Sequence, residues 1–389
     1  MALPIAMTSQ ASAQSSITLN GAGATFPAPL IKEWTLKYQT VTPNVNINYQ
    51  AIGSGAGIKQ LTAKTVDFGA SDAPLSAGQR ANFTGPVVHI PETIGSVVVA
   101  YNIPEFPNKG LKFTGSVLGD IFLGKVKNWN DPEITQLNPG ANLPNQPIVV
   151  VHRSDGSGTT FVWTSYLSKV SPAWNTTVGH GTAVQWPTGL GQSGNQGVAN
   201  TVGVPNSGSG TAYSIGYVEL AYALTSKMTY GDIQNQAGNF IEPTLDSTKQ
   251  AVQNAATQLP SGDGDWSKVS LLNAPGNQSY PIATFTYIIL YKDMSANVKT
   301  QAQAQAVVDF IKWAVTDGQQ QSSALGYVPL PDSIVQADLQ TLGSLSFGQT
   351  QLTVPEFPFV PVLMAFSFVG VIAYLRLAGK IGSKFGLGI

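Results

Sequence analysis

Strand-like and helix-like segments alternate along most of this chain of 389 residues. Val45, Ile47 and Tyr49 recur at every second position, as on one face of a strand, and apolar residues at helical spacing precede them. Further strands are expected at 87–90, 95–103, 147–152 and 283–292, and further helices at 116–124, 159–170, 216–226 and 303–316. Several of these strands are apolar almost throughout, which is typical of sheets covered by helices. The pattern predicts an α/β protein in which the Gly-, Ser- and Asn-rich stretches 188–211 and 261–280 are surface loops.

The composition excludes several classes of protein. Charged residues make up 11% of the chain and the formal net charge is −1, so no nucleic acid is expected as a partner. The sequence has no cysteine, which excludes disulfides, thiolate metal sites and thiol nucleophiles. His89, His152 and His180 lack the spacing of metal ligands, so neither a metal nor a cofactor is expected. The length is sufficient for two lobes with sizeable cores.

The N-terminal segment 1–13 ends in the small residues Ala-Ser-Ala. A short apolar stretch before such a triplet is typical of a signal-peptide cleavage site, and the alternative is an unstructured N-terminus. Three Asn-x-Ser/Thr sequons, at Asn82, Asn175 and Asn277, are compatible with a location outside the cytoplasm. We therefore interpret 1–13 as the remnant of a signal peptide.

The segment 357–375 contains no charged residue and is long enough to cross a bilayer core of about 30 Å as a helix. Basic residues follow it at Arg376, Lys380 and Lys384. The positive charges predict that the tail 376–389 is cytoplasmic and that the body lies outside. A buried core helix is the alternative, but the chain has nothing after it to pack against. The preceding stretch 341–356 is expected to be a spacer, and 354–358 resembles the Pro-Glu-Phe signals of archaeal surface proteins.

Four short segments rich in glycine and hydroxyl residues stand where a strand gives way to a helix. They are residues 21–27, 52–57, 67–75 and 153–160. Backbone amides at a helix N-terminus bind anions, and glycine lets the backbone approach a ligand closely. Arg153 is one of only three arginines and lies in the fourth segment, where a guanidinium beside such amides would hold an oxyanion.

Known enzyme motifs do not fit this chain. It contains neither the GxxxxGK[ST] phosphate loop nor the GxSxG nucleophile elbow. Asp67 and Asp72 form a conceivable acid pair, but no nucleophile or metal-ligand set completes a site. The chain is therefore not expected to be an enzyme.

Seven ordered motifs between residues 18 and 335 resemble the phosphate-binding proteins of the ABC phosphate uptake (Pst) system. They are GAGATFPAPL, IGSGAG, VDFGASDAPLS, GDIFLGKVKNWNDPEI, RSDGSGTTFVWTSYL, IGYVELAYA and LPDSIV. Together they are far more specific than any single glycine motif. The membrane segment and its flanks suggest an archaeal, membrane-anchored form of this family.

The resemblance implies a type II periplasmic binding protein: two α/β lobes joined by two crossing strands, here followed by a C-terminal transmembrane helix. The crossings are expected within 96–102 and 282–291. Lobe one then consists of 14–98 and 283–340, and lobe two of 99–282. Phosphate would lie between the lobes.

The resemblance assigns four ligand contacts to the first lobe. Thr25 and Phe26 match the residues whose amides, together with the threonine hydroxyl, hold one phosphate oxygen. Ser54 matches the serine of the second loop. Asp72 matches the buried carboxylate that accepts the proton of the ligand.

Five further contacts are implied in the second lobe. Arg153 matches the clamping arginine and Asp155 the carboxylate that steadies it. Ser157, Gly158 and Thr159 match the helix N-terminus that closes the site.

The implied function is capture of inorganic phosphate on the outer face of the membrane and its delivery, as a monomer, to ABC permease subunits with a cytoplasmic ATPase. An ionised Asp72 can only accept hydrogen bonds, so it would favour a protonated oxyanion over sulfate. The alternatives are a binding protein for sulfate, molybdate or phosphonate, a surface phosphoesterase, or a structural surface-layer protein.

Overall fold

The computed structural model describes residues 16–255 and 259–354. The chain divides into two compact units, Met1–Leu352 and Thr353–Ile389, and nearly all described residues belong to the first unit. The fold set out below is that of the first unit.

Three predicted segments lie outside the described residues: the signal segment 1–13, the membrane helix 357–375 and the basic tail 376–389. In the part of the chain that is described, no helix has both the length and the apolar character needed to cross a membrane. The expected spacer 341–356 is partly folded, because it contains a small hairpin in which Leu345 and Leu352 are buried.

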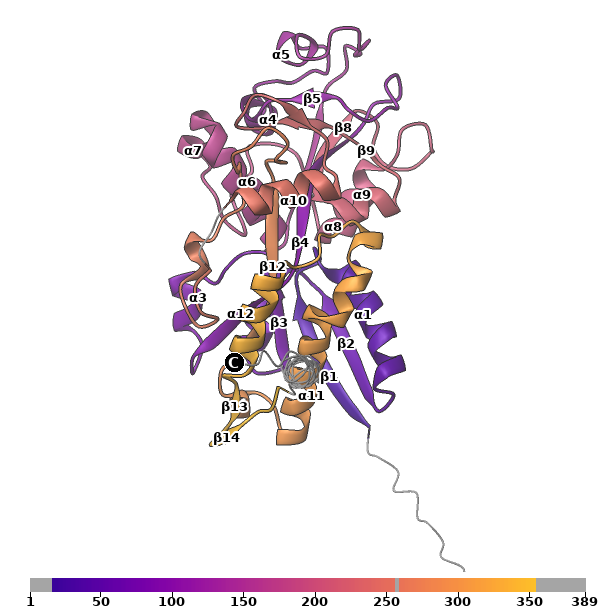
Figure 1. Ribbon diagram of the computed structural model, residues 1–389. Helices are drawn as coiled ribbons and strands as arrows, with labels where there is room; N and C mark the ends of the chain where they lie inside the picture. Colours follow the sequence, from indigo (N-terminus) through magenta and orange to yellow (C-terminus); the bar gives the residue numbers. More distant parts are fainter. Residues whose placement is uncertain (1–15, 256–258, 355–389) are drawn as a thin grey trace, which may run out of the picture. The chain divides into compact units, whose positions relative to one another are not determined.

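Nine strands of the described residues form one sheet in the order β2-β1-β3-β12-β4-β8-β6-β7, with β9 paired to β4. Their bounds are β1 Ile17–Gly23, β2 Val45–Ala51, β3 Phe68–Ser71, β4 Val87–Asn102, β6 Val149–Arg153, β7 Leu190–Gln192, β8 Ser214–Glu219, β9 Thr229–Tyr230 and β12 Ala283–Tyr291. We call β1, β2, β3 and β12 the first half of the sheet, and β6, β7, β8 and β9 the second half. Figure 1 shows β4 running from one half into the other.

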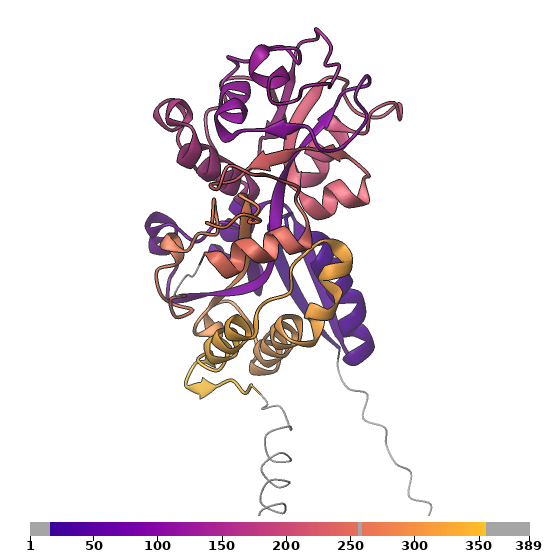
Figure 2. The same ribbon diagram turned by 45° about the horizontal axis from the view of Figure 1, so that its top comes forward.

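Twelve α-helices are described around these strands. They are α1 Ala28–Val41, α2 Ser54–Thr62, α3 Ala77–Ala81, α4 Gly115–Phe122, α5 Pro132–Thr135, α6 Gly158–Val170, α7 Pro172–Thr177, α8 Gly194–Val202, α9 Leu220–Thr225, α10 Leu245–Asn254, α11 Gln301–Val315 and α12 Asp332–Leu342. Helices α1, α2 and α11 contact strands of the first half, and α6 and α8 contact strands of the second. Helices α11 and α12 lie side by side, with α11 next to α1 (Figure 2).

Short elements complete the described fold. A three-stranded sheet comprises β5 Lys112–Phe113, β10 Asp232–Gln234 and β11 Phe240–Ile241, and the hairpin comprises β13 Ser346–Phe347 and β14 Thr350–Gln351. The 3-10 helices are η1 Trp266–Lys268, η2 Met294–Ala296, η3 Asp317–Gln321 and η4 Ser323–Leu325.

Strand β4 is continuous where the sequence predicted two strands, at 87–90 and 95–103. Its residues Val87–Ser96 pair antiparallel with β12, and Val97–Asn102 pair antiparallel with β8. Pro91 lies inside this strand, although proline cannot donate to a ladder. The pairing with β12 instead shifts by one residue beside Pro91, and this bulge accommodates the proline.

Two other expectations were wrong in part. Residues 216–226, predicted to be a helix, form the end of β8 and then α9, because a short buried apolar run has the same composition in a strand and in a helix. Residues 188–211, predicted to be a loop, contain β7 and α8. Val198, Ala199 and Val202 are buried at helical spacing on α8, but glycine and polar residues obscure this pattern in the sequence.

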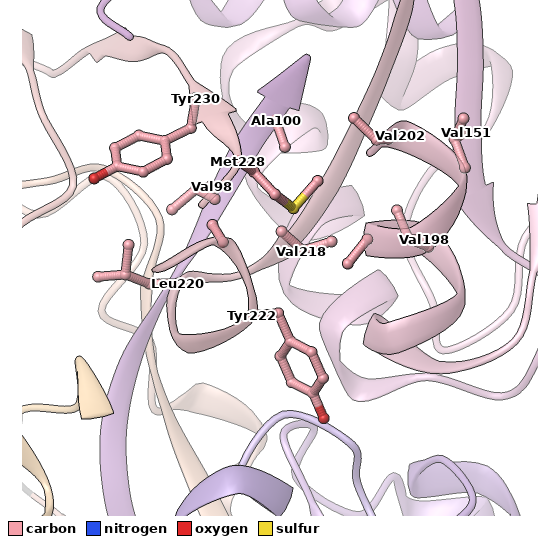
Figure 3. Close-up of a cluster of buried hydrophobic side chains, with 12 residues drawn as sticks. Val98, Ala100, Val151, Val198, Val202, Val218, Leu220, Tyr222, Met228 and Tyr230 are labelled. Carbon is pink, nitrogen blue, oxygen red and sulfur yellow. The ribbon is translucent and has the colours of Figure 1, made fainter. Parts of the chain in front are cut away.

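The core of the second half gathers apolar side chains from β4, β6, β8, β9, α8 and α9 (Figure 3). Tyr222 lies at the edge of this cluster, and its hydroxyl points out of it. That hydroxyl donates to the carbonyl of Thr25, 2.6 Å away, in the loop after β1. The core of the second half is thereby attached to a loop that belongs to the first half.

A substitution at Gly57 on α2 tests how closely this helix must approach strand β1. A Cβ there would lie 2.3 Å from the Gly23 Cα and 2.5 Å from the Ala22 carbonyl oxygen, and neither backbone can yield easily. Gly57→Ala is expected to lower the free energy of unfolding by about 1–3 kcal/mol, measured by urea denaturation. Gly78→Ala on α3 is the matched control, because nothing lies within 4 Å of its Cβ. Equal stability of the two variants would contradict this account of the packing.

Candidate functional site

The four glycine- and hydroxyl-rich segments lie at the carboxyl ends of parallel strands. Strands β1, β2 and β3 run parallel and end in the segments that contain Thr25, Ser54 and Asp72. Strand β6 is parallel to β7 and β8 and ends at Arg153, and Ser157 caps the N-terminus of α6. Carboxyl ends of parallel strands meet at one edge of a sheet, which is where open α/β sheets bind ligands.

Hydrogen bonds join these segments across the two halves. The Gly158 amide donates to Ser54 Oγ at 3.0 Å, and Thr159 Oγ1 donates to Asp72 Oδ2 at 3.1 Å. Asn195 Nδ2 donates to Thr25 Oγ1 at 2.9 Å. The structure thus brings the predicted site residues of both halves into one buried cluster, which we call the interlobe cluster.

Three hydroxyls of the cluster have oxygens that already accept hydrogen bonds. Thr25 Oγ1 accepts from the backbone amide and the side-chain amide of Asn195. Ser54 Oγ accepts from the Gly158 amide, and Ser157 Oγ accepts from an amide in the first turn of α6. A hydroxyl has one hydrogen to donate, so each of these side chains keeps that hydrogen for a further acceptor.

Tyrosines hold the backbone of the first loop. The hydroxyls donate to three consecutive carbonyls: Tyr49 to Ala24 at 2.7 Å, Tyr222 to Thr25 at 2.6 Å and Tyr327 to Phe26 at 2.7 Å. In a planar trans peptide the N–H points away from the C=O. Fixing the carbonyls of Ala24 and Thr25 therefore also fixes the directions of the amides of Thr25 and Phe26.

Arg153 supplies the buried positive charge. The residue is 2% exposed, and its Nε and Nη2 donate to the two Asp155 oxygens at 2.7 and 2.5 Å. Burial raises the pKa of Asp155, but the hydrogen bonds and charge of Arg153 outweigh this and hold it below its ordinary value. Such bidentate pairing fixes the guanidinium plane. Nη1 of Arg153 faces the interior of the cluster, 3.4 Å from Thr159 Oγ1.

Asp72 is a buried carboxyl of the cluster and is 2% exposed. Thr159 Oγ1 donates to its Oδ2, and Thr286 Oγ1 lies 3.2 Å from its Oδ1. Burial raises the pKa of Asp72 to about 7, although the charge of Arg153 and the two threonine hydroxyls oppose this change. Burial thus favours the protonated form of this carboxyl, whereas Arg153 and the threonine hydroxyls favour the ionised form.

Sequence reasoning missed four polar residues of this region: Asn195, Thr286, Glu92 and Glu219. Asn195 belongs to the helix that was predicted to be a loop. Thr286 has no signal of its own, because it is one of two threonines in an apolar strand. Glu92 and Glu219 could have been noticed, since each is a lone carboxyl within an uncharged, apolar segment.

Glu219 supports the first loop indirectly. Its Oε2 accepts from the Ala221 amide at 2.9 Å, which caps α9, and lies 3.1 Å from the Tyr327 hydroxyl. Burial raises the pKa of Glu219 well above its ordinary value. Among the described residues, no group of three or more His, Cys, Asp or Glu side chains is placed to hold a metal ion.

Comparison with known proteins gives consistent matches over most of the chain. A family profile described as a PBP superfamily domain matches residues 8–317. The phosphate-binding protein PstS of Pasteurella multocida is 46% identical over 319 residues, covering 82% of this chain and 88% of that protein. PstS of Methanocaldococcus jannaschii is 37% identical over 344 residues, with coverages of 85% and 87%.

A solved structure has the same fold. The high-affinity periplasmic phosphate-binding protein PfluDING, bound with phosphate, aligns with a TM-score of 0.65 and 20% identity. The alignment covers 88% of this chain and 100% of that one. On the extent and identity of the sequence matches, the chain belongs to the PBP superfamily and, within it, to the family of the phosphate-binding proteins PstS.

Proposed function

We propose that this chain captures inorganic phosphate and is not an enzyme. The observation that carries the proposal is a buried acceptor, Asp72, placed among hydrogen-bond donors: the Arg153 guanidinium and three hydroxyls with engaged oxygens. Phosphate needs donors for its bare oxygens and one acceptor for its hydroxyl. The names of the family members point to the same ligand.

The same arrangement explains selection against sulfate. Phosphate retains a hydroxyl proton near neutral pH, whereas sulfate has none. A sulfate oxygen would face the lone pairs of Asp72 without a hydrogen between them. Sites built on such a polar match reject the unmatched analogue by about 10⁴-fold or more. Asp72 therefore disfavours sulfate and molybdate, and phosphonate is the closest competitor because it can also carry a hydroxyl.

The proposed ligand contacts are Thr25, Phe26, Ser54, Asp72, Arg153, Asp155, Ser157, Gly158 and Thr159. They come from two lobes, 14–98 with 283–340 and 99–282, joined at β4 and β12. Closure of the lobes around phosphate would create the shape that ABC permease subunits with a cytoplasmic ATPase recognise. We propose that the chain does this as a monomer outside the cytoplasm, in an archaeal, membrane-anchored form.

Asp72→Asn tests the origin of selectivity. The amide keeps the volume of the carboxyl but can donate to an unprotonated sulfate oxygen. The ratio of phosphate affinity to sulfate affinity is expected to fall by about 10–100-fold, the value of one hydrogen bond to a charged group. Competition calorimetry measures this ratio. Asp67→Asn is the matched control, since Asp67 is also buried but bonds to Asn20 and Gln303. An unchanged ratio in Asp72→Asn would show that the carboxyl does not discriminate.

Arg153→Ala tests the affinity for both anions rather than the discrimination between phosphate and sulfate. The change removes the buried positive charge and leaves Asp155 without its partner. Binding of phosphate and sulfate should weaken together by about 2–5 kcal/mol. Arg80→Ala, at a half-buried guanidinium that bonds to the Gly264 carbonyl, should leave both affinities unchanged. Loss of only one anion in Arg153→Ala would contradict the proposed role.

The uncharged segment 357–375 is proposed to anchor the chain in the membrane. The full chain should remain with membranes after alkaline extraction and dissolve in detergent. A chain that ends at Leu352, the boundary of the first compact unit, should be released while still binding phosphate. Equal release of both chains would exclude the anchor.

A further inference from the structure

Glu92 is a completely buried carboxyl on β4, with 0% of its surface exposed. It is not among the proposed ligand contacts. It stands at the bulge: Thr286 pairs with Thr93 and Tyr287 with Pro91, so the pairing skips Glu92. A bulge changes the direction of the side chain that it carries. Here Thr286 Oγ1 lies 3.1 Å from Glu92 Oε1 and 3.2 Å from Asp72 Oδ1.

The single hydroxyl hydrogen of Thr286 limits the protonation states that Asp72 and Glu92 can have together. Its hydroxyl has one hydrogen but two carboxyl oxygens within hydrogen-bond distance, and an ionised carboxylate cannot donate. Both contacts are hydrogen bonds only if Asp72 or Glu92 carries a proton. A buried hydroxyl between two carboxylates would leave one oxygen unsatisfied, which is strongly unfavourable.

The neighbouring groups favour a proton on Glu92 rather than on Asp72. Thr159 Oγ1 accepts from Arg153 Nη1 and from Asn195 Nδ2, so its own hydrogen is directed to Asp72. The positive charge of Arg153 also favours the ionised form of Asp72. Glu92 has the Thr286 contact, and its other oxygen, Oε2, is buried without a hydrogen-bond partner.

We infer that Glu92 is a positioning residue for anion selection: it keeps its proton and donates to Thr286, whose hydroxyl then donates to Asp72. In this way Asp72 is held ionised and oriented, ready to accept the hydroxyl of the bound anion. The inference rests on the proposed function, because it concerns how that site recognises a protonated oxyanion.

The charges around Glu92 predict a proton linkage. Burial raises the pKa of Glu92 to about 8, and the negative charge of Asp72 adds to the effect. Tyr49 is the other titratable group that interacts with Glu92. Beyond Asp72 lie Arg153, Asp155, Glu219, Tyr222 and Tyr327. An arriving phosphate brings more negative charge, so it should raise the pKa of Glu92 further, and binding above this pH should take up a proton.

The experiment is calorimetric titration of the full chain with inorganic phosphate between about pH 7 and about pH 10, spanning the value for Glu92. Buffers that differ in ionisation enthalpy give the number of protons taken up. Above about pH 8 the wild type should take up close to one proton for each phosphate bound. Its phosphate affinity should then fall with rising pH, with a slope that approaches about tenfold per pH unit. In Glu92→Gln the amide can donate to Thr286 permanently. This variant should bind phosphate within about threefold of wild type at pH 7, and the uptake should disappear.

Asp338→Asn is the matched control. Asp338 on α12 is a buried carboxyl whose pKa burial also raises, but it is not part of the interlobe cluster. The proton uptake and affinity of this variant should equal those of the wild type. If Glu92→Gln does not fold, Thr286→Val interrupts the same chain of hydrogen bonds and should lower the phosphate-to-sulfate ratio.

Three outcomes would overturn the inference. Undiminished proton uptake in Glu92→Gln would place the linked proton on another group. A gain of tenfold or more in phosphate affinity at pH 7 would mean that Glu92 is normally ionised and repels the ligand. An unchanged selectivity ratio in Thr286→Val would show that the hydroxyl does not orient Asp72. Absence of phosphate binding by the wild type would instead overturn the proposed function, and this inference with it.

Discussion

Arg153 holds its guanidinium against both oxygens of Asp155 in a place where almost no solvent reaches it. This pair is nearly neutral as a unit, so the proposed site would not attract an anion by net charge alone. Attraction would come from hydrogen-bond donors whose partners are already fixed, which the loops after β1, β2 and β6 supply. The charge of Arg153 has a second effect, because it favours ionised Asp72 in surroundings that otherwise favour protonation.

Strand β4, which crosses between the halves, and its partner β12 also contribute chemistry. Strand β4 carries Glu92 and β12 carries Thr286, so the residues that govern Asp72 belong to the segment about which the halves would move. A displaced strand pairing would change the distance from Thr286 to both carboxyls. If the halves move, recognition of the anion and this movement would depend on the same few backbone contacts.

The sequence predicts those parts of the candidate site that are formed by short contiguous segments. Glycine and hydroxyl residues at a strand-to-helix turn are recognisable from a few neighbouring residues, so the segments that hold Thr25, Ser54, Asp72 and Arg153 could be singled out as candidates, and the structure brings them together. The contacts of Thr286 with Glu92 and Asp72 depend on the pairing of strands about 190 residues apart in sequence and on the bulge between them. That register is a property of the assembled sheet, and no short motif encodes it. Asn195 was missed for a different reason, because the helix that carries it resembles a glycine-rich loop in composition.

The three tyrosines on the loop after β1 do not all belong to one half. Tyr49 is on β2 of the first half, and Tyr327 follows η4 beside a bridge to β4, whereas Tyr222 comes from α9, packed in the core of the second half. Opening of the lobes would therefore release one clamp and leave the other two in place. In such an open state the loop would be largely preformed when an anion arrives, which would favour fast capture. The Tyr222 hydrogen bond would then form last, and its strength would set how long the anion is retained before it is handed on.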